Sequence, residues 1–347
     1  MEPTPVAVVG AGAFGRNHLR VYRELELADP SSVQLAALVE PDPTRRDHFA
    51  NLYNIPAFAS VDELLGAELT IHAASICVPT IHHAAVAEQL LQANLDILIE
   101  KPFAATLAEA DHLITLAAQH NRIVAIGHLE RFNPAVTATL AALNKPMFFE
   151  AHRLSIFTPR SLDVDVVLDL MIHDLDIVLS LTNSPVREVR AVGLAILSKK
   201  VDIANVRVEF ESGCVANFTA SRVSTEQVRK LRLFQPHQYL SLDFARQELL
   251  SINVDPRAPA LLSSLPPSSL APLQTPGEAT HPSAGLNLQK LDLPRAEPLR
   301  LELEDFLHAV ATRTEPRVPA EAGRAALSLA LEINSEIARH AHRAGLA

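Results

Sequence analysis

The glycine-rich stretch near the start of the chain constrains the fold most. Residues 6–9 (VAVV) are small and apolar, as in a buried parallel strand, and the motif GAGAFG of residues 10–15 follows directly. In a GxGxxG motif between a strand and a helix, the first glycine permits a tight turn, the second lets a pyrophosphate approach, and the third lets the helix pack closely. The helix also offers free N–H groups and a positive dipole end to phosphate. The motif therefore predicts dinucleotide binding, with a glycine-rich turn that binds nothing as the alternative.

An acidic residue follows the second predicted strand, residues 35–39, and refines the choice of dinucleotide. Glu40 can accept both ribose hydroxyls of adenosine, and its charge would repel a 2′-phosphate. We therefore expect NAD as the cofactor, with NADP less favoured. The predicted contacts in these two segments are Gly10, Gly12, Ala13, Phe14, Gly15 and Glu40.

The first third of the chain alternates predicted strands and helices. This βαβ rhythm predicts an α/β fold with a doubly wound parallel sheet, in which ligands bind at the carboxyl ends of the strands. Further candidates for cofactor contacts follow two later strands and are Pro79, Thr80, His83, Glu100, Lys101 and Pro102. For His83 the simpler alternative is the start of a surface helix.

The rhythm changes after Gly127, where extended segments follow one another without intervening helices. Strands in series predict an antiparallel sheet, so the second half is expected to be an α+β domain. We predict an NAD-binding domain at residues 1–127 and a substrate and oligomerisation domain at residues 128–347. Within the latter, residues 255–298 are rich in proline and serine and are expected to form a surface loop or mobile insertion.

The composition excludes several classes of protein. The 347-residue chain has a formal net charge of −10, which argues against a nucleic-acid partner or a polybasic membrane surface. No apolar run reaches the ~20 residues that a membrane span needs. The two cysteines have neither metal-site nor disulfide spacing, and a signal peptide is not expected before the first strand. We therefore expect a cytoplasmic protein without membrane insertion and without a metal.

Two groups of residues could carry chemistry. Lys101 follows a strand at the functional edge of the predicted sheet, where a cation could stabilise an alkoxide or lower the pKa of a hydroxyl, although a solvated lysine is an equal alternative. Asp169 and His173 lie four residues apart in an apolar helix predicted over residues 164–181, so they share one face. Such a pair could orient an imidazole for proton transfer; the alternatives are a core histidine with its own acid and, with no third ligand evident, a metal site.

Three arginines flank the expected cleft between the domains and are candidates for substrate binding. They are Arg131, Arg153 and Arg160. Guanidinium groups suit carboxylates and pyrophosphates, but surface salt bridges explain most arginines.

Taken together, the motifs resemble the Gfo/Idh/MocA family of glucose-fructose oxidoreductases and inositol dehydrogenases. The matching features are GxGxxG, the acid at Glu40, the Glu-Lys-Pro run at residues 100–102 and Asp169 with His173, over nearly the whole chain. The resemblance implies an N-terminal Rossmann domain and a C-terminal domain with an open, mostly antiparallel sheet that builds homodimers or homotetramers. It also implies catalytic roles for Lys101, Asp169 and His173.

The segment before and within the predicted helix departs from the family pattern and narrows the resemblance. Met171 stands where family members commonly have glycine. The run DVDVVLDLMIHDLD, with residues 221–224 and 229–232, is similar to a subgroup of UDP-N-acetylglucosamine 3-dehydrogenases linked to lipid A synthesis. The resemblance therefore implies oxidation of the 3-hydroxyl of that UDP-sugar by NAD. The alternatives are a dehydrogenase or reductase of a free polyol or another sugar, such as an inositol, and a non-catalytic NAD-binding sensor.

Overall fold

The computed structural model describes residues 2–157, 164–254 and 286–345. Contacts between residues divide the chain into two compact units. Unit 1 comprises Met1–Phe132 and Glu297–Ser328, and unit 2 comprises Asn133–Ala296 and Leu329–Ala347. This division differs from the single boundary predicted after residue 127, because a late segment of the chain returns to the N-terminal unit.

Unit 1 is built on a six-stranded parallel sheet with the order β3-β2-β1-β4-β5-β6. The strands are β1 (Thr4–Val9), β2 (Val33–Val39), β3 (Ala57–Phe58), β4 (Ala73–Ile76), β5 (Asp96–Glu100) and β6 (Val124–Gly127). The order reverses between β1 and β4, so the crevice at their carboxyl ends is the switch point where ligands bind in such sheets. The predicted doubly wound parallel sheet is confirmed.

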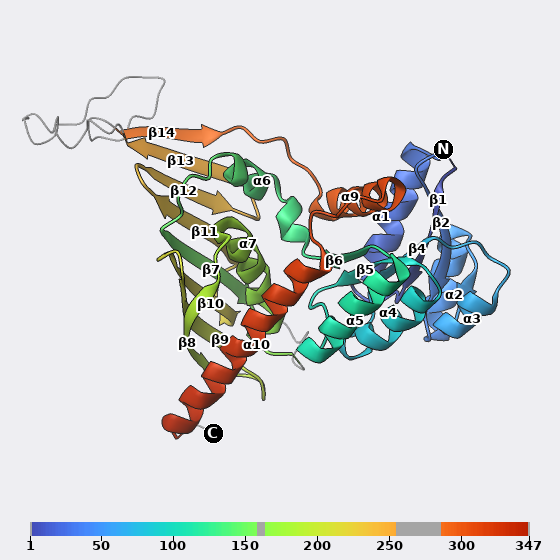
Figure 1. Ribbon diagram of the computed structural model, residues 1–347, viewed down its shortest axis with the longest axis horizontal. Coiled ribbons are helices and arrows are strands. Elements are labelled where there is room, and N and C mark those ends of the chain that lie inside the picture. Colours follow the sequence, from blue (N-terminus) through green and yellow to red (C-terminus); the bar gives the residue numbers. More distant parts are fainter. Residues whose placement is uncertain (1, 158–163, 255–285, 346–347) are drawn as a thin grey trace, which may run out of the picture. The chain divides into compact units, whose positions relative to one another are not determined.

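Helices connect these strands. They are α1 (Gly15–Ala28), α2 (Pro43–Tyr53), α3 (Val61–Gly66), the short 3₁₀ helix η1 (Thr80–His82), α4 (His83–Gln92), α5 (Leu107–His120) and the 3₁₀ helix η2 (Leu129–Phe132). In Figure 1, α4 and α5 lie side by side, as do α1 and α9 (Pro298–Thr312).

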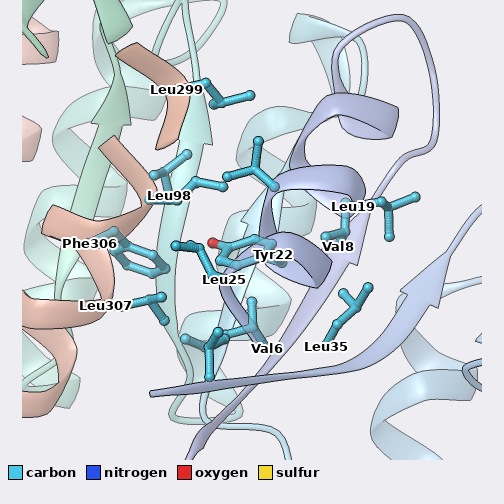
Figure 2. Packing of buried hydrophobic residues seen from close by; sticks show 14 of the residues in the cluster. Val6, Val8, Leu19, Tyr22, Leu25, Leu35, Leu98, Leu299, Phe306 and Leu307 are labelled. Atoms are coloured by element: carbon cyan, nitrogen blue, oxygen red, sulfur yellow. The ribbon is translucent and has the colours of Figure 1, made fainter. Parts of the chain in front are cut away.

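The late helix α9 belongs to unit 1 because its apolar stripe completes the N-terminal core. Figure 2 shows Phe306 and Leu307 of α9 beside Tyr22 and Leu25 of α1, and Leu299 belongs to the same cluster. The Phe306 ring is fully buried there. Burial of an aromatic side chain is worth a few kcal/mol, so the N-terminal segment alone would leave a large apolar surface on α1 exposed.

Unit 2 contains an eight-stranded sheet with the order β14-β13-β12-β11-β7-β10-β9-β8. The strands are β7 (Phe148–Ile156), β8 (Val186–Leu194), β9 (Ile203–Phe210), β10 (Val215–Ser224), β11 (Val228–Gln235), β12 (Gln238–Asp243), β13 (Glu248–Val254) and β14 (Leu286–Leu291). Among the described strands of this sheet, only β7 and β10 form a parallel pair. The mostly antiparallel sheet predicted for this half is therefore confirmed.

One face of this sheet is covered by helices. The helical segments of this half are α6 (Pro134–Ala141), the π-helix η3 (Val167–Met171), α7 (Ile172–Thr182) and the part of α10 (Ala320–Arg343) from Leu329 onward. The α6 helix packs against β12 and β13, and η3 packs against β10. Inward-facing residues of β9, such as Val206 and Val208, are fully buried, whereas the alternate residues Asn205 and Arg207 are exposed.

Two details of unit 2 differ from expectation. The helix predicted from residue 164 begins in a π-helical turn at Val167, and only continues as an α-helix from Ile172. Residues 255–298 were expected to form one long loop, but β14 lies within this range and α9 begins at its end. Residues 255–285 of that range lie outside the described part of the chain.

Among the described residues, none of the helices has both the length and the apolar character to cross a membrane.

Candidate functional site

The glycine turn after β1 has the geometry of a phosphate-binding loop. Gly10 has a φ of +93°, and a Cβ atom there would lie 2.8 Å from the carbonyl oxygen of Cys77. A Cβ atom at Gly15 would lie 1.8 Å from the carbonyl oxygen of Gly10. These two positions must therefore be glycine, the first for the turn and the second for the close approach of α1.

Gly12 has a different role, because it faces open space. A Cβ atom there would meet no other atom within 4 Å. The first turn of α1 carries no acidic side chain, so nothing there repels an anion. Ala13 and Phe14 complete the loop that leads into α1, with the Phe14 side chain 37% exposed. The loop thus leaves its backbone open at the position where a pyrophosphate would lie.

Glu40 lies directly after β2 and is bound to the glycine loop. Its carboxylate accepts hydrogen bonds from the Ala11 N–H at 2.8 Å, from the Asp42 N–H at 3.0 Å and from the Arg45 guanidinium at 2.9 Å. Burial alone would raise the pKa of Glu40, but these hydrogen bonds and the positive charge of Arg45 hold it below its usual value. The residue therefore stays ionised near neutral pH, as an acceptor for ribose hydroxyls must be.

A cavity of about 600 Å³ lies at the carboxyl ends of β1, β2 and β4. Of the predicted cofactor residues, its wall includes Gly10, Gly12, Glu40 and Pro79. Apolar side chains and a few polar ones supply the rest, among them Val39, Val61, Val86, Arg45, His82 and Gln89. This combination of an apolar slot and few polar groups is typical of a small-molecule site, and here it suits an adenosine.

Sequence reasoning did not identify several residues in this wall. Arg45 lies in the first turn of α2, and Ser60 and Val61 come from the entry into α3, a helix of six residues that was not predicted. His82 lines the cavity, whereas its neighbour His83 does not. An arginine five residues after an acid that ends a strand is the signal that could have pointed to Arg45.

His83 is instead buried between two backbone segments. Its Nδ1 atom lies 2.9 Å from the carbonyl oxygen of Pro102, and its Nε2 atom lies 2.9 Å from that of Val78. The ring therefore links the turn after β4, which lines the cavity, to the Lys101-Pro102 peptide, which is cis. Thr80 is the first residue of η1, which follows the turn after β4.

The Glu-Lys-Pro run follows β5 at the same edge of the sheet. Glu100 is 6% exposed, and its carboxylate pairs with His18 of α1 at 2.9 Å. The second carboxylate oxygen accepts the Lys101 N–H at 3.3 Å. Lys101 itself is partly exposed, as a side chain that meets a ligand must be.

The predicted acid and base of unit 2 lie at the start of its central helix. Asp169 belongs to the π-helical turn and His173 is the second residue of α7, so the wider turn of η3 lies between them. Single π-helical turns occur frequently at functional sites. The Arg222 guanidinium of β10 donates to the Val164 carbonyl oxygen at 2.6 Å and lies 3.9 Å from the Asp169 carboxylate.

Arg153 ties this helix to the sheet. Its guanidinium is buried and forms two hydrogen bonds to the Asp174 carboxylate, at 2.9 and 2.8 Å. Such a paired fork in a dry environment fixes the helix beside β7. Arg153 forms this ion pair in the structure, and its predicted role in substrate binding stays a prediction. Arg131 lies in η2, and Arg160 lies outside the described residues.

In the described part of the chain, no cluster of three or more histidine, cysteine or acidic side chains has the arrangement of a metal site.

Comparison with known protein families identifies both halves of the chain. Residues 4–128 match the family described as "Oxidoreductase family, NAD-binding Rossmann fold". Residues 138–235 match the "GFO/IDH/MocA C-terminal domain". The order of the two matches agrees with the parallel sheet and the antiparallel sheet described above.

Individual proteins are similar over most of the length. A UDP-N-acetylglucosamine 3-dehydrogenase from Acidithiobacillus ferrooxidans is 37% identical over 327 residues, which cover 94% of this chain and 95% of that protein. A solved structure of the enzyme of that name and organism superimposes with a TM-score of 0.83 at 35% identity, covering 97% of this chain and 98% of the other. An inositol 2-dehydrogenase from Leifsonia xyli subsp. xyli is 30% identical over 200 residues, or 54% of this chain and 57% of its own.

The match to the Rossmann-fold family, over residues 4–128, contains three features of the site described above. They are the glycine turn, the buried acid after β2 and the Glu-Lys-Pro run. The residues present also fit the cofactor of such proteins, since Gly12 faces open space and Glu40 is held ionised. On both sequence and structure, this chain belongs to the NAD-binding Gfo/Idh/MocA oxidoreductase family.

Proposed function

We propose that this protein oxidises the 3-hydroxyl of UDP-N-acetylglucosamine with NAD. The observation that carries the proposal is the 37% identity to an enzyme of that name over 94% of this chain. The candidate residues Lys101, Asp169 and His173 are all present in the sequence, so the proposal includes turnover rather than cofactor sensing alone.

The proposed reaction transfers a hydride and a proton from one alcohol. Bound NAD supplies the acceptor for the hydride that leaves carbon 3 of the sugar. Lys101 or His173 accepts the hydroxyl proton, and the Asp169 carboxylate orients the His173 ring. The positive charge of Lys101 also stabilises the developing alkoxide. The product is the 3-keto sugar, and both electrons of the broken C–H bond leave with the hydride.

The cofactor contacts are proposed from the cavity and the loop. Glu40 accepts the ribose hydroxyls of adenosine, and the backbone around Gly12 faces the pyrophosphate. Pro79 and the apolar side chains of the cavity wall pack against the adenosine. Arg131 and Arg153 are the candidates for the diphosphate of the substrate within the described residues, because a guanidinium matches phosphate geometry.

A free polyol is the second candidate substrate. The partial similarity to inositol 2-dehydrogenases favours it, at 30% identity over 54% of this chain. A UDP-sugar and a free polyol differ in their diphosphate, which gives a simple test. UDP is expected to compete with the substrate if the enzyme binds a nucleotide sugar, and to have no effect on oxidation of a free polyol.

The direct experiment measures NADH absorbance with NAD and a panel of sugars, with an amine reagent that traps ketones. The trap is needed because oxidation of an alcohol by NAD is usually uphill. Formation of NADH that requires UDP-N-acetylglucosamine, and fails with free N-acetylglucosamine or myo-inositol, supports the proposal. NADH formation with myo-inositol alone replaces the first candidate by the second.

We also propose a cytoplasmic homo-oligomer that associates through the sheet of unit 2. The face without helices carries an aromatic cluster of Phe148, Phe234 and Tyr239, whose rings lie 4.9 to 5.5 Å apart along the cluster. Phe234 is 38% exposed. Such a surface favours association of two sheets, so sedimentation should give a mass of two or four chains, and Phe234→Glu should reduce it.

A further inference from the structure

We propose that the buried pair of His18 and Glu100 is a positioning device for Lys101. Through Glu100, the pair would fix the backbone position of Lys101 relative to α1. The Lys101 amine would then be held where the substrate hydroxyl is deprotonated. This inference rests on the role proposed above for Lys101.

His18 makes a single directed contact. It lies in the first turns of α1, its side chain is fully buried, and its Nε2 atom is 2.9 Å from Oε1 of Glu100. A carboxylate oxygen accepts, so the pair is satisfied in the tautomer in which Nε2 carries the hydrogen. Among the described residues, Nδ1 has no hydrogen-bond partner. Within the described chain, the hydrogen bond of this ring is therefore the one to Glu100.

The carboxylate of Glu100 has little room to move. A Cβ atom at Gly127, in the neighbouring strand β6, would lie 2.9 Å from its Cδ atom and 3.0 Å from each oxygen. The carboxylate is thus held between α1 on one side and the backbone of β6 on the other. Its Oε2 atom accepts the Lys101 N–H at 3.3 Å, so a displacement of the carboxylate displaces the peptide that carries Lys101.

The other side of Lys101 is also fixed. The carbonyl oxygen of Pro102 lies 2.9 Å from Nδ1 of His83, which is itself buried in α4. Lys101 therefore stands between two backbone positions that are held by buried histidines from two different helices. A lysine on a short segment held at both ends keeps its stem in one place, which is what a group that must meet a substrate proton requires.

A purely structural role is the alternative, and it makes a different prediction. Removing one partner of a buried hydrogen bond leaves the other unsatisfied and costs stability, whatever the pair does for catalysis. If the pair only fills the interior, His18→Leu should affect the free energy of unfolding and leave the chemical step alone. If it positions Lys101, the chemical step should slow.

The test compares kcat, KM and a kinetic isotope effect in matched variants of the full-length protein. His18→Leu removes the hydrogen bond, whereas His18→Gln keeps an N–H donor near the position of Nε2. Tyr22→Phe is the control, because it removes a different buried hydrogen bond on the same helix, the one between the Tyr22 hydroxyl and Ser75 at 2.8 Å.

We expect His18→Leu to lower kcat by about 10- to 100-fold, as a small displacement of a reacting group does. NAD affinity should change by less than about threefold, and the primary isotope effect with UDP-N-acetylglucosamine deuterated at carbon 3 should increase as chemistry becomes rate-limiting. His18→Gln should recover most of kcat, and Tyr22→Phe should keep the kcat and isotope effect of the unaltered protein.

Two results would refute the inference, and a third tests the role of Lys101 on which it rests. A folded His18→Leu protein with unaltered kcat and isotope effect shows that the pair is only structural. If His18→Leu does not fold, Gly127→Ala serves instead, because it pushes on the same carboxylate without removing a polar group; unaltered kcat there also refutes the inference. Lys101→Met separates the two proposals, since turnover that survives this change refutes the role of Lys101 itself, whatever His18 does.

Discussion

At the scale of single residues, Glu40 combines two tasks that are usually assigned separately. It accepts hydrogen bonds from the glycine loop and from α2, and its ionised oxygens face the cavity at the end of β2. Arg45, whose side chain is 53% exposed, lies 2.9 Å from this carboxylate and offsets its charge. A cofactor with a 2′-phosphate would meet the carboxylate directly, whereas Arg45 would favour that phosphate if the carboxylate were removed.

Replacement of Glu40 by Ala is therefore expected to weaken the preference for NAD over NADP. Loss of hydrogen bonds to a charged group costs about 1.5–3 kcal/mol, so kcat/KM for NAD should fall by roughly 10- to 100-fold. Steady-state rates with each cofactor measure the ratio. Asp47→Ala, which removes an exposed carboxylate from the same helix α2, is the control and should leave the ratio unchanged. An unchanged ratio in Glu40→Ala would remove the ribose role.

His83 gives the protein a predictable sensitivity to acid. Its two ring nitrogens face carbonyl oxygens, yet burial lowers the pKa of His83 below its ordinary value of about 6.5. The unfolded chain therefore binds more protons than the folded one as the pH falls below about 6.5, and the free energy of unfolding decreases there. Above about pH 7 both states are neutral at this position, and the contribution is constant.

A glutamine at position 83 should flatten this pH dependence, because it does not titrate. Between pH 7.5 and 5.5, wild-type protein should lose stability more steeply than His83→Gln, by at most about 1.4 kcal/mol per pH unit. Urea denaturation at several pH values gives the comparison. His112→Gln removes an exposed histidine and should follow the wild-type curve. Parallel curves for wild type and His83→Gln would contradict the assignment.

At the scale of elements, the start of the central helix of unit 2 depends on one carboxylate. Asp165 accepts the N–H groups of Val167 and Leu168 at 2.9 and 3.0 Å, and its second oxygen accepts a hydrogen bond from Asn334 of α10 at 3.1 Å. The Val166 N–H meanwhile donates to the Val201 carbonyl oxygen. These contacts explain why the helix begins at Val167, although the apolar pattern predicted a start at residue 164.

Asp165→Ala should therefore destabilise the protein and also reduce turnover. Loss of a helix cap costs about 0.5–2 kcal/mol. Because Asp169 lies one turn along the same helix, kcat should fall as well, by several-fold to about tenfold. Thr106→Ala is the matched control, since Thr106 caps α5 through a capping box. Thr106→Ala should lose similar stability and keep kcat. If Asp165→Ala also kept kcat, the cap at Asp165 would have no effect on the catalytic site.

The α9 helix illustrates an element whose existence, but not its position, follows from the sequence. Its apolar spacing predicts a helix over residues 301–311, and the structure has one at Pro298–Thr312. The same stripe could cover any apolar surface, and nothing local says that Phe306 meets α1 about 280 residues earlier. Long-range packing of this kind is decided by the whole core.

A cavity-creating change tests this packing. Phe306→Ala should lower the free energy of unfolding by about 3–5 kcal/mol, because a fully buried ring is removed. Leu27→Ala, at a side chain that is 73% exposed, should change it by less than about 0.5 kcal/mol. Denaturant unfolding measures both. A loss below about 1 kcal/mol for Phe306→Ala would show that α9 does not belong to this core.

At the scale of the whole molecule, the sequence predicted those features that depend on interactions between neighbouring residues. The sequence predicts a helix over residues 43–53, and α2 has these bounds because Asp42 caps it and Pro43 suits its first turn. The glycine turn and Glu40 lie where the motif placed them, since both depend on neighbouring residues. Strand β13 was missed because its alternation, with Leu249 and Ser251 buried, is short and mixed in polarity.

The site was predictable only in part for the same reason. A motif identifies Lys101. The two residues that fix its backbone, His18 and His83, come from helices α1 and α4, and only the folded chain brings them close to it. A buried histidine in a helix has no local signature that separates it from a solvated one. Arg153 is a further case, because nothing in the local sequence indicates that its guanidinium would be buried against Asp174 of α7.

In the proposed reaction a hydride leaves carbon 3 of UDP-N-acetylglucosamine and reaches NAD. Incubation of the protein with NAD and this substrate deuterated at carbon 3, with a trap for the ketone, allows the mass of the NADH formed to be determined. We expect NADH that carries one deuterium from the sugar. Unlabelled NADH, or none formed by protein that binds NAD, would contradict the proposed reaction.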